Sequence, residues 1–237
     1  MSAKMKQRVG VVLFVVGILL GLGVTGLSVW AHVEMLFFGF PRFTTNALAL
    51  DCPRFLAWDE TAEVRTKVVN TNSHPATMGV KSWVSVPLAW DVQTEHRRLE
   101  PGEVWEWSRT IGPENRELRH FVFVSVYTFG GYPIPEKQNM CGVYVLPVKG
   151  IRGDTVMWIA VVIALLALVS GWWLWRSSYH GRGSPSTMAN MAVNFFLVIV
   201  PLTVIVTLWV AWMLGVMLLL VATLMLVIVG LTWLMHV

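Results

Sequence analysis

The sequence predicts an α+β membrane protein with four transmembrane helices and an extracytoplasmic antiparallel β-sandwich, of the immunoglobulin or fibronectin type, inserted between helices 1 and 2. Two observations predict this class. All 14 acidic residues lie between Glu34 and Asp154, and the flanking stretches are long, apolar and charged only by Lys and Arg. Within the central region, short segments alternate apolar and polar residues between turn residues, which is typical of strands with one buried face.

The first predicted span covers residues 9–31, after a basic cytoplasmic tail of residues 1–8. It has no charged residue and is longer than the ~20 residues that a helix needs to cross a hydrocarbon layer of ~30 Å. We expect it to be retained as an anchor. A signal peptide cleaved after Ala31 is the alternative, because a basic segment precedes the apolar stretch.

Two glycines of this span, Gly17 and Gly21, have the spacing that lets two helices approach closely in a membrane. We expect them to form a helix-packing face. The alternative is that they reflect only the general frequency of glycine in transmembrane helices.

From Ala189 to the end of the sequence there is no Asp, Glu, Lys or Arg. A single helix of that length would reach ~70 Å, more than twice the hydrocarbon thickness, and must therefore fold back. The turn is expected between Trp209 and Gly215, where an interfacial aromatic pair precedes a glycine. The third and fourth predicted spans are residues 189–210 and 213–236.

The orientation follows from the basic residues, because short cytoplasmic loops are enriched in Lys and Arg. The flanks carry Lys4, Lys6, Arg8, Arg176 and Arg182. The second predicted span, residues 154–175, ends just before a loop of residues 176–188 that holds two of them. We therefore expect both termini and this loop in the cytoplasm of a bacterial cell, and residues 32–153 outside its membrane.

The exported region is expected to contain six to eight short strands. Its clearest segment, residues 62–68, alternates small or apolar residues with charged ones. The other predicted strands are residues 78–86, 104–111, 118–127 and 142–148. Turns rich in Gly, Pro and Asn separate them, including residues 70–75 and 130–133. The apolar residues 36–41 are expected to rest on the bilayer or to pack against the sandwich.

The segment Leu99-Glu-Pro-Gly-Glu103 predicts a turn that leads into a strand, with Trp105 and Trp107 on one face and Glu106 on the other. This turn resembles the Leu-x-Pro-Gly-Glu turn of bacterial immunoglobulin-like modules. The resemblance covers only the turn and the start of the strand. It implies a fold for the exported region and no particular activity.

The only cysteines of the sequence, Cys52 and Cys141, both lie in the exported region. Disulfides form in oxidising compartments, so we expect these residues to be bonded. The bond would hold the beginning and the end of the exported region together. Two buried free thiols are the alternative.

No catalytic, cofactor-binding or metal-binding motif is recognisable. There is no G-x-S-x-G elbow and no phosphate loop after a strand. A blue-copper site requires histidines near the cysteine, yet the first His after Cys141 is His180, beyond the second span. His32 is a minor candidate metal ligand, since cleavage after Ala31 would make it the N-terminus. The other histidines of the exported region, His74, His96 and His120, show no paired spacing.

These observations favour a non-enzymatic accessory or scaffold subunit of a larger membrane complex, whose exported sandwich binds other membrane or envelope proteins. The spans lack ionisable groups at depth, which disfavours a self-contained pump, and the basic excess lies in the flanks, which disfavours nucleic acid as a partner. Four tryptophans are candidates for an interface or for the core: Trp83, Trp90, Trp105 and Trp107. The alternative function is the handling of a metal or small ligand. A sensor is a weaker third possibility, because the inner loop is short.

Overall fold

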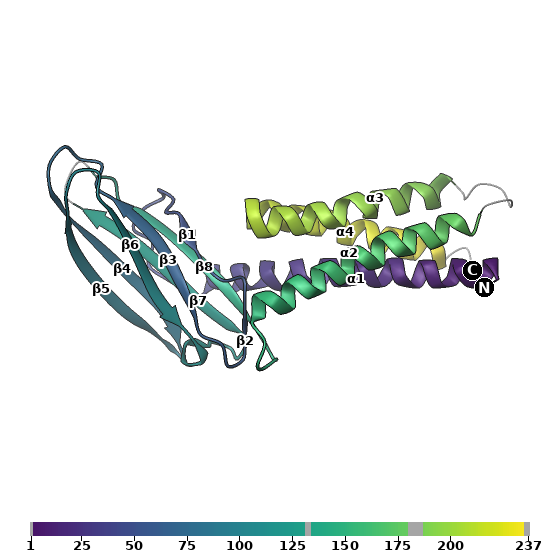
Figure 1. The fold of residues 1–237 in the computed structure, drawn as a ribbon, viewed down its shortest axis with the longest axis horizontal. Helices are drawn as coiled ribbons and strands as arrows, with labels where there is room; N and C mark the ends of the chain where they lie inside the picture. The colour runs from purple at the N-terminus through teal and green to yellow at the C-terminus, as the bar shows by residue number, and fades with distance from the viewer. Residues whose placement is uncertain (1, 131–133, 180–186, 235–237) are drawn as a thin grey trace. The chain divides into compact units, whose positions relative to one another are not determined.

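The computed structural model describes residues 2–130, 134–179 and 187–234. The chain divides into two compact units. The helical unit consists of the two flanks, up to Val29 and from Val156 onward, and the β unit consists of Trp30–Thr155. In Figure 1 the helices are purple at the start of the chain and green to yellow at its end, and the strands are blue to teal.

Four helices among the described residues are long and apolar enough to cross a membrane, which is compatible with a multi-pass membrane protein. They are α1 (Ala3–Phe37), α2 (Gly153–Ser177), α3 (Thr187–Ile205), continued by a π-helical turn η2 (Val206–Val210), and α4 (Trp212–Leu234). α1 extends beyond the predicted span at both ends, because the basic tail and the residues after Ala31 continue the helix. The glycine-containing segment 180–185 of the predicted inner loop, and His236, lie outside the described residues.

The chain folds back at Ala211, inside the predicted turn region. Ala211 has an extended backbone (φ −160°, ψ 121°), and its N–H donates to the carbonyl oxygen of Val206 over 3.0 Å. A Cβ added to Gly215 would collide with the side chain of Thr207. A glycine is therefore required where the first turn of α4 lies against η2.

An apolar cluster joins all four helices. Its buried members are Phe14, Ile18, Leu168, Phe196, Ile199, Val200 and Ala222. Glycines set the approach of the backbones: an added Cβ would lie 2.8 Å from the carbonyl oxygen of Ala164 at Gly17, and 2.5 Å from Val200 Cγ1 at Gly21. Gly171 of α2 is as tightly packed, with Phe14 N at 2.5 Å from an added Cβ. Gly17 thus lies against α2 and Gly21 against α3, and Gly171 of α2 adds a second close contact with α1.

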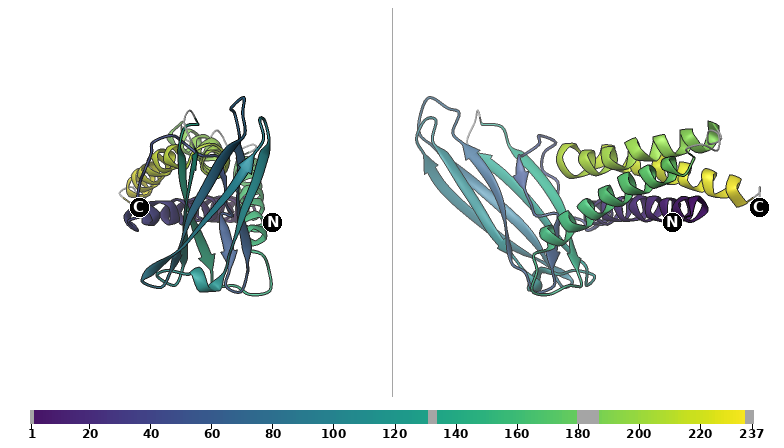
Figure 2. Two further views of the ribbon diagram at one scale, coloured as in Figure 1. Left: turned by 90° about the vertical axis from the view of Figure 1, so that its left-hand side faces the viewer. Right: turned by 45° about the vertical axis from the view of Figure 1, so that its right-hand side comes forward.

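The β unit contains two sheets. Its described strands are β1 (Leu50–Asp51), β2 (Phe55–Ala57), β3 (Ala62–Val69), β4 (Ala76–Val86), β5 (Ala89–Leu99), β6 (Val104–Ile111), β7 (Phe121–Gly130) and β8 (Lys137–Leu146). They form a three-stranded sheet of order β1-β3-β6 and a five-stranded sheet of order β2-β8-β7-β4-β5. All pairs are antiparallel except β2 with β8. A short 3-10 helix, η1 (Pro113–Asn115), follows β6 and lies at one end of the strands (Figure 2).

The facing sides of the two sheets share one apolar core. Val64, Val68 and Trp107 come from the smaller sheet, and Val80 and Val124 from the larger. The predicted disulfide is present: Cys52, next to β1, is bonded to Cys141 in β8, with 6.6 Å between the Cα atoms. The bond therefore links the two sheets.

A second apolar layer covers the other face of the five-stranded sheet. There Phe121, Phe123 and Trp83 pack against Ala31 and Phe40, from the end of α1 and the segment after it. Of the two predictions for residues 36–41, packing against the sheet is the one observed. β7 is consequently buried on both faces, which explains its nearly unbroken apolar sequence.

The starts of two predicted strands were wrong, and some strands were missed. Residues 118–120 are not part of a strand, because Glu117 and Phe121 close a turn in which Leu118 and Arg119 have φ of 48° and 68°. The last strand begins at Lys137 rather than at residue 142. β1, β2 and β5 were not predicted at all. Residues 131–133 of the predicted turn 130–133 lie outside the described residues.

Candidate functional site

β5 is the candidate functional element of the β unit. It is the last strand in the order of the five-stranded sheet, and among the described residues no strand pairs with its other side. Ten of its eleven side chains are exposed, and only Leu99 is buried. A long edge strand of this kind carries unpaired backbone N–H and C=O groups that can pair with another strand.

The side chains on the inner face of β5 attach it to the smaller sheet. Three contacts cross from β5 to β6 or to the residue just before β6: Asp91 with Arg109 (2.5 Å), Glu95 with the indole N–H of Trp107 (3.0 Å) and Arg97 with Glu103 (3.1 Å). β5 is therefore fixed along its length, although only one of its sides is paired. A fixed strand loses little conformational entropy when a partner binds.

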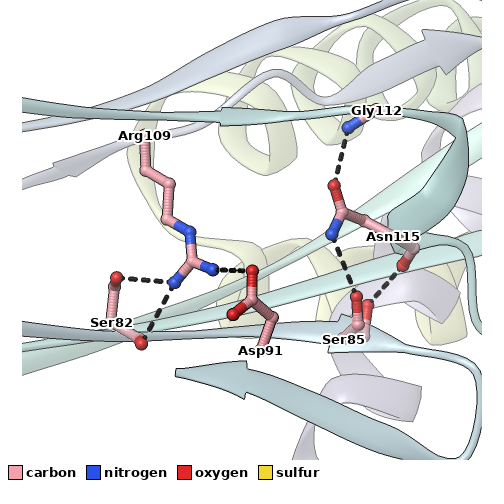
Figure 3. A network of polar contacts seen from close by, with 6 residues as sticks. All are labelled: Ser82, Ser85, Asp91, Arg109, Gly112 and Asn115. Carbon is pink, nitrogen blue, oxygen red and sulfur yellow. Dashed lines mark hydrogen bonds and ion pairs between the residues drawn. The ribbon is translucent and has the colours of Figure 1, made fainter. Parts of the chain in front are cut away.

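Arg109 is the central group of this attachment (Figure 3). Its side chain is only 6% exposed, and it donates to the Ser82 carbonyl oxygen (3.1 Å) and to Ser82 Oγ (2.8 Å) as well as to Asp91. Burial lowers the pKa of Arg109, and the nearby Asp91 carboxylate opposes that shift. The guanidinium still remains charged at neutral pH, because arginine is not deprotonated in proteins.

The turn that starts β5 is also held from outside the strand. Leu88 has a φ of 65°, which is costly for a branched side chain. Its N–H donates to Glu117 Oε2 over 3.1 Å, and Glu117 is buried. Ser85 Oγ donates to the carbonyl oxygen of Asn115 over 2.6 Å, which joins η1 to the end of β4 (Figure 3). The side chain of Leu88 itself is 96% exposed.

The outer face of β5 offers apolar surface beside the free edge. Trp90 and Val92 are 42% and 44% exposed, and they are followed on the same face by Thr94, His96 and Arg98. The ring of Trp90 rests on Phe40 at 5.8 Å, and His96 meets the ring of Phe129 edge-on at 5.5 Å. A free backbone edge flanked by partly exposed apolar side chains is the arrangement used for recognition by strand addition.

The structure separates the four candidate tryptophans. Trp83, Trp105 and Trp107 are buried in the two apolar layers, and Trp90 remains accessible on β5. Sequence reasoning missed the strand around it, because Asp91, Gln93, Glu95 and Arg97 make the segment look like a solvated loop. A signal was present: these polar residues alternate with Trp90, Val92 and Thr94, immediately after the two-residue turn Pro87-Leu88.

The predicted metal ligand and the other histidines do not converge. His32 is buried on α1, among the residues that cover the five-stranded sheet. His120 stacks on Tyr144 with 6.0 Å between the ring centroids, and His74 is exposed in a turn. Within the part of the chain that the structure describes, no group of three or more His, Cys, Asp or Glu is placed to hold a metal ion.

No protein-family model matches the chain, and no curated protein matches it. Parts of many solved structures are similar to it. Examples are a β-glucuronidase of Bacteroides uniformis (17% identity over 41% of this chain and 13% of that chain, TM-score 0.32), a transglutaminase of red sea bream (9% identity, 45% and 17%, TM-score 0.34) and a β-glucosidase of Erythrobacter marinus (16% identity, 43% and 15%, TM-score 0.31). The chain spans less than a fifth of these proteins, and likenesses of this size carry no argument about its function.

Proposed function

We propose that the protein is a non-enzymatic, membrane-anchored subunit whose β unit is an immunoglobulin-type sandwich outside the cytoplasmic membrane. In this proposal the β unit binds a protein of the membrane or envelope by strand addition at β5. The observation that carries it is the combination found at β5: a free edge, a rigid attachment and exposed apolar side chains next to that edge.

The proposed location rests on the charges and on the disulfide. The described helices α1 to α4 are apolar, and the basic residues of the flanks favour the cytoplasm for both termini. A disulfide in the β unit favours an oxidising compartment. Retention of the first span is supported by the complete burial of Ala31, because cleavage there would break the apolar layer to which it belongs.

The location is tested by labelling with an impermeant thiol reagent in intact cells. A cysteine at Ser73, which is exposed in the β unit, is expected to react. A cysteine at Ser2, exposed near the N-terminus, is expected to react only after permeabilisation. Ser178 is a poor probe because it is buried, and Ser184 lies outside the described residues. Reaction at Ser2 in intact cells would contradict the proposed orientation.

The binding role is tested by photo-crosslinking in intact cells. A photoreactive residue is placed at Val92 of β5 and, as a control, at Val104 of β6, which is also an edge-strand valine and is 48% exposed. We expect a crosslinked product of defined mass from position 92 and none from position 104. Equal products at both positions, or none at position 92, would contradict strand addition at β5.

A further inference from the structure

β5 has a sequence that is complementary to itself. On its inner face the order is Asp91, Gln93, Glu95 and Arg97, with an acidic residue near the start of the strand and a basic one near its end. On its outer face Trp90 and Val92 lie near the start, and His96 and Arg98 near the end. Two copies of such a strand, placed antiparallel, bring the start of one beside the end of the other.

We propose that the partner of β5 is β5 of a second copy of this chain, paired antiparallel with Thr94 on the two-fold axis. This proposal rests on the proposed function, because it names the strand that is added at β5. The two five-stranded sheets would then join into one continuous sheet across the axis. The contact would be isologous, as in most homodimers.

The register follows from the charges. With Thr94 on the axis, the full length of Ala89–Leu99 is paired, because Thr94 is the central residue of the strand. Asp91 then lies opposite Arg97 of the second copy, and Gln93 lies opposite Glu95. Opposite charges at such cross-strand positions are favourable, and like charges are unfavourable.

The registers centred on Gln93 or on Glu95 are less favourable, because each places like charges opposite each other. With Gln93 on the axis, Asp91 would face Glu95 of the second copy. With Glu95 on the axis, the two Glu95 side chains would face each other. Larger shifts would pair fewer residues and leave part of the edge open. The register centred on Thr94 therefore combines the longest ladder with no like-charge pair.

The outer face supports the same register. Trp90 comes to lie opposite Arg98 of the second copy, a pairing that allows the guanidinium to stack on the indole ring. Val92 comes to lie opposite His96. Each contact occurs twice because of the two-fold symmetry, and the exposed side chains of Trp90 and Val92 become covered.

Cysteine crosslinking of the full-length protein in its native membrane tests the register. The chain has no free cysteine to interfere, because Cys52 and Cys141 are bonded to each other. Thr94→Cys is expected to form a disulfide-linked dimer under mild oxidation, since cross-strand Cβ atoms lie ~4.5–5.5 Å apart. Thr110→Cys, an exposed position on edge strand β6, serves as the control and is expected to stay monomeric.

Two further variants separate this register from random collision. Val92→Cys alone is expected not to crosslink, because its copy would be four residues, or ~13 Å, away along the partner strand. His96→Cys alone is likewise expected not to crosslink. Co-expression of the Val92→Cys and His96→Cys chains should restore a crosslinked dimer. Crosslinking of Val92→Cys alone as strongly as Thr94→Cys would overturn the proposal.

The charge at position 93 gives a second readout, in the background of Thr94→Cys. Gln93→Lys should raise the crosslinked fraction and Gln93→Glu should lower it, each by at least about twofold in association constant, because residue 93 faces Glu95. With Glu95 on the axis, residue 93 would face Arg97 and the two effects would be reversed. A crosslink from position 92 to a different protein, without any homodimer of Thr94→Cys, would refute the proposal that the partner is a second copy of this chain. The proposal that a partner binds by strand addition at β5 would remain.

Discussion

The ion pair between Asp91 and Arg109 should contribute far more to stability than the ion pair between Lys67 and Glu106. The pairs have similar distances, 2.5 Å and 2.7 Å, and each joins β6 to another strand. Their burial differs: the side chains are 6% and 49% exposed for Arg109 and Asp91, and 69% and 73% exposed for Lys67 and Glu106. The pair between Lys67 and Glu106 therefore serves as a solvated reference for the buried pair.

The expected magnitude follows from this burial. A hydrogen bond to a charged group contributes about 1.5–3 kcal/mol, and the half-exposed carboxylate of Asp91 reduces the expected coupling to about 1.5–2 kcal/mol. Asp91→Ala leaves the buried guanidinium with Ser82 alone. Arg109→Met removes the charge and keeps most of the apolar stem. The coupling energy is obtained from these two single variants and the double variant.

The assay is urea unfolding of the full-length protein in mild detergent, followed by near-UV circular dichroism of the aromatic side chains, which include the buried indoles Trp105 and Trp107. The same cycle with Lys67→Ala and Glu106→Ala provides the control, for which no measurable coupling is expected because both side chains are solvated. Free energies are compared only if the urea dependence is unchanged among the variants. A coupling for Asp91 and Arg109 no larger than that of the control pair would refute the reasoning.

Three other changes have outcomes that the structure predicts. Cys141→Ser should lower the free energy of unfolding by about 4.5 kcal/mol, since the bond closes a loop with a sequence separation of 89, and reduction of the wild type should have the same effect on its urea midpoint. Gly171→Ala should lower the thermal stability of the helices, measured by far-UV circular dichroism, because the added Cβ collides with Phe14. Gly26→Ala is the control and should have no such effect, because nothing lies within 4 Å of a Cβ added there. Equal effects of the two variants would contradict the described helix packing. Desolvation raises the pKa of Tyr127 to about 12 in the folded protein. The folded state should therefore lose stability as the pH rises from the ordinary tyrosine pKa near 10 to about 12, because the unfolded chain releases this proton first. Urea midpoints measured across this pH range should fall less for Tyr127→Phe than for the wild type.

The apolar flanks could be recognised from the sequence as helices long and apolar enough to cross a membrane, because length and composition can be read without knowing which elements pack together. The fold-back near Ala211 could be placed for a similar reason, since a single helix over this uncharged stretch would be about twice as long as the hydrocarbon layer is thick and would carry apolar residues into water. The inner faces of β3 and β6 could also be read, because alternation with period two is a local property. The pairing of Cys52 with Cys141 followed from there being only two cysteines.

β5 and β7 show what required the tertiary structure. β7 is apolar on both faces because residues from Ala31 to Phe40, distant in sequence, cover its outer side. β5 is polar on its inner face because Arg109 and Trp107 reach it from the other sheet. Neither of these contacts can be inferred from the sequence of the strand itself, since the burial of a side chain depends on which distant element packs against it. The sequence alone determined which segments are long and apolar enough to cross a membrane and which faces of β3 and β6 point inward. Only the tertiary structure decided that β5 lies at an edge of its sheet, because an edge is defined by the absence of a neighbouring strand.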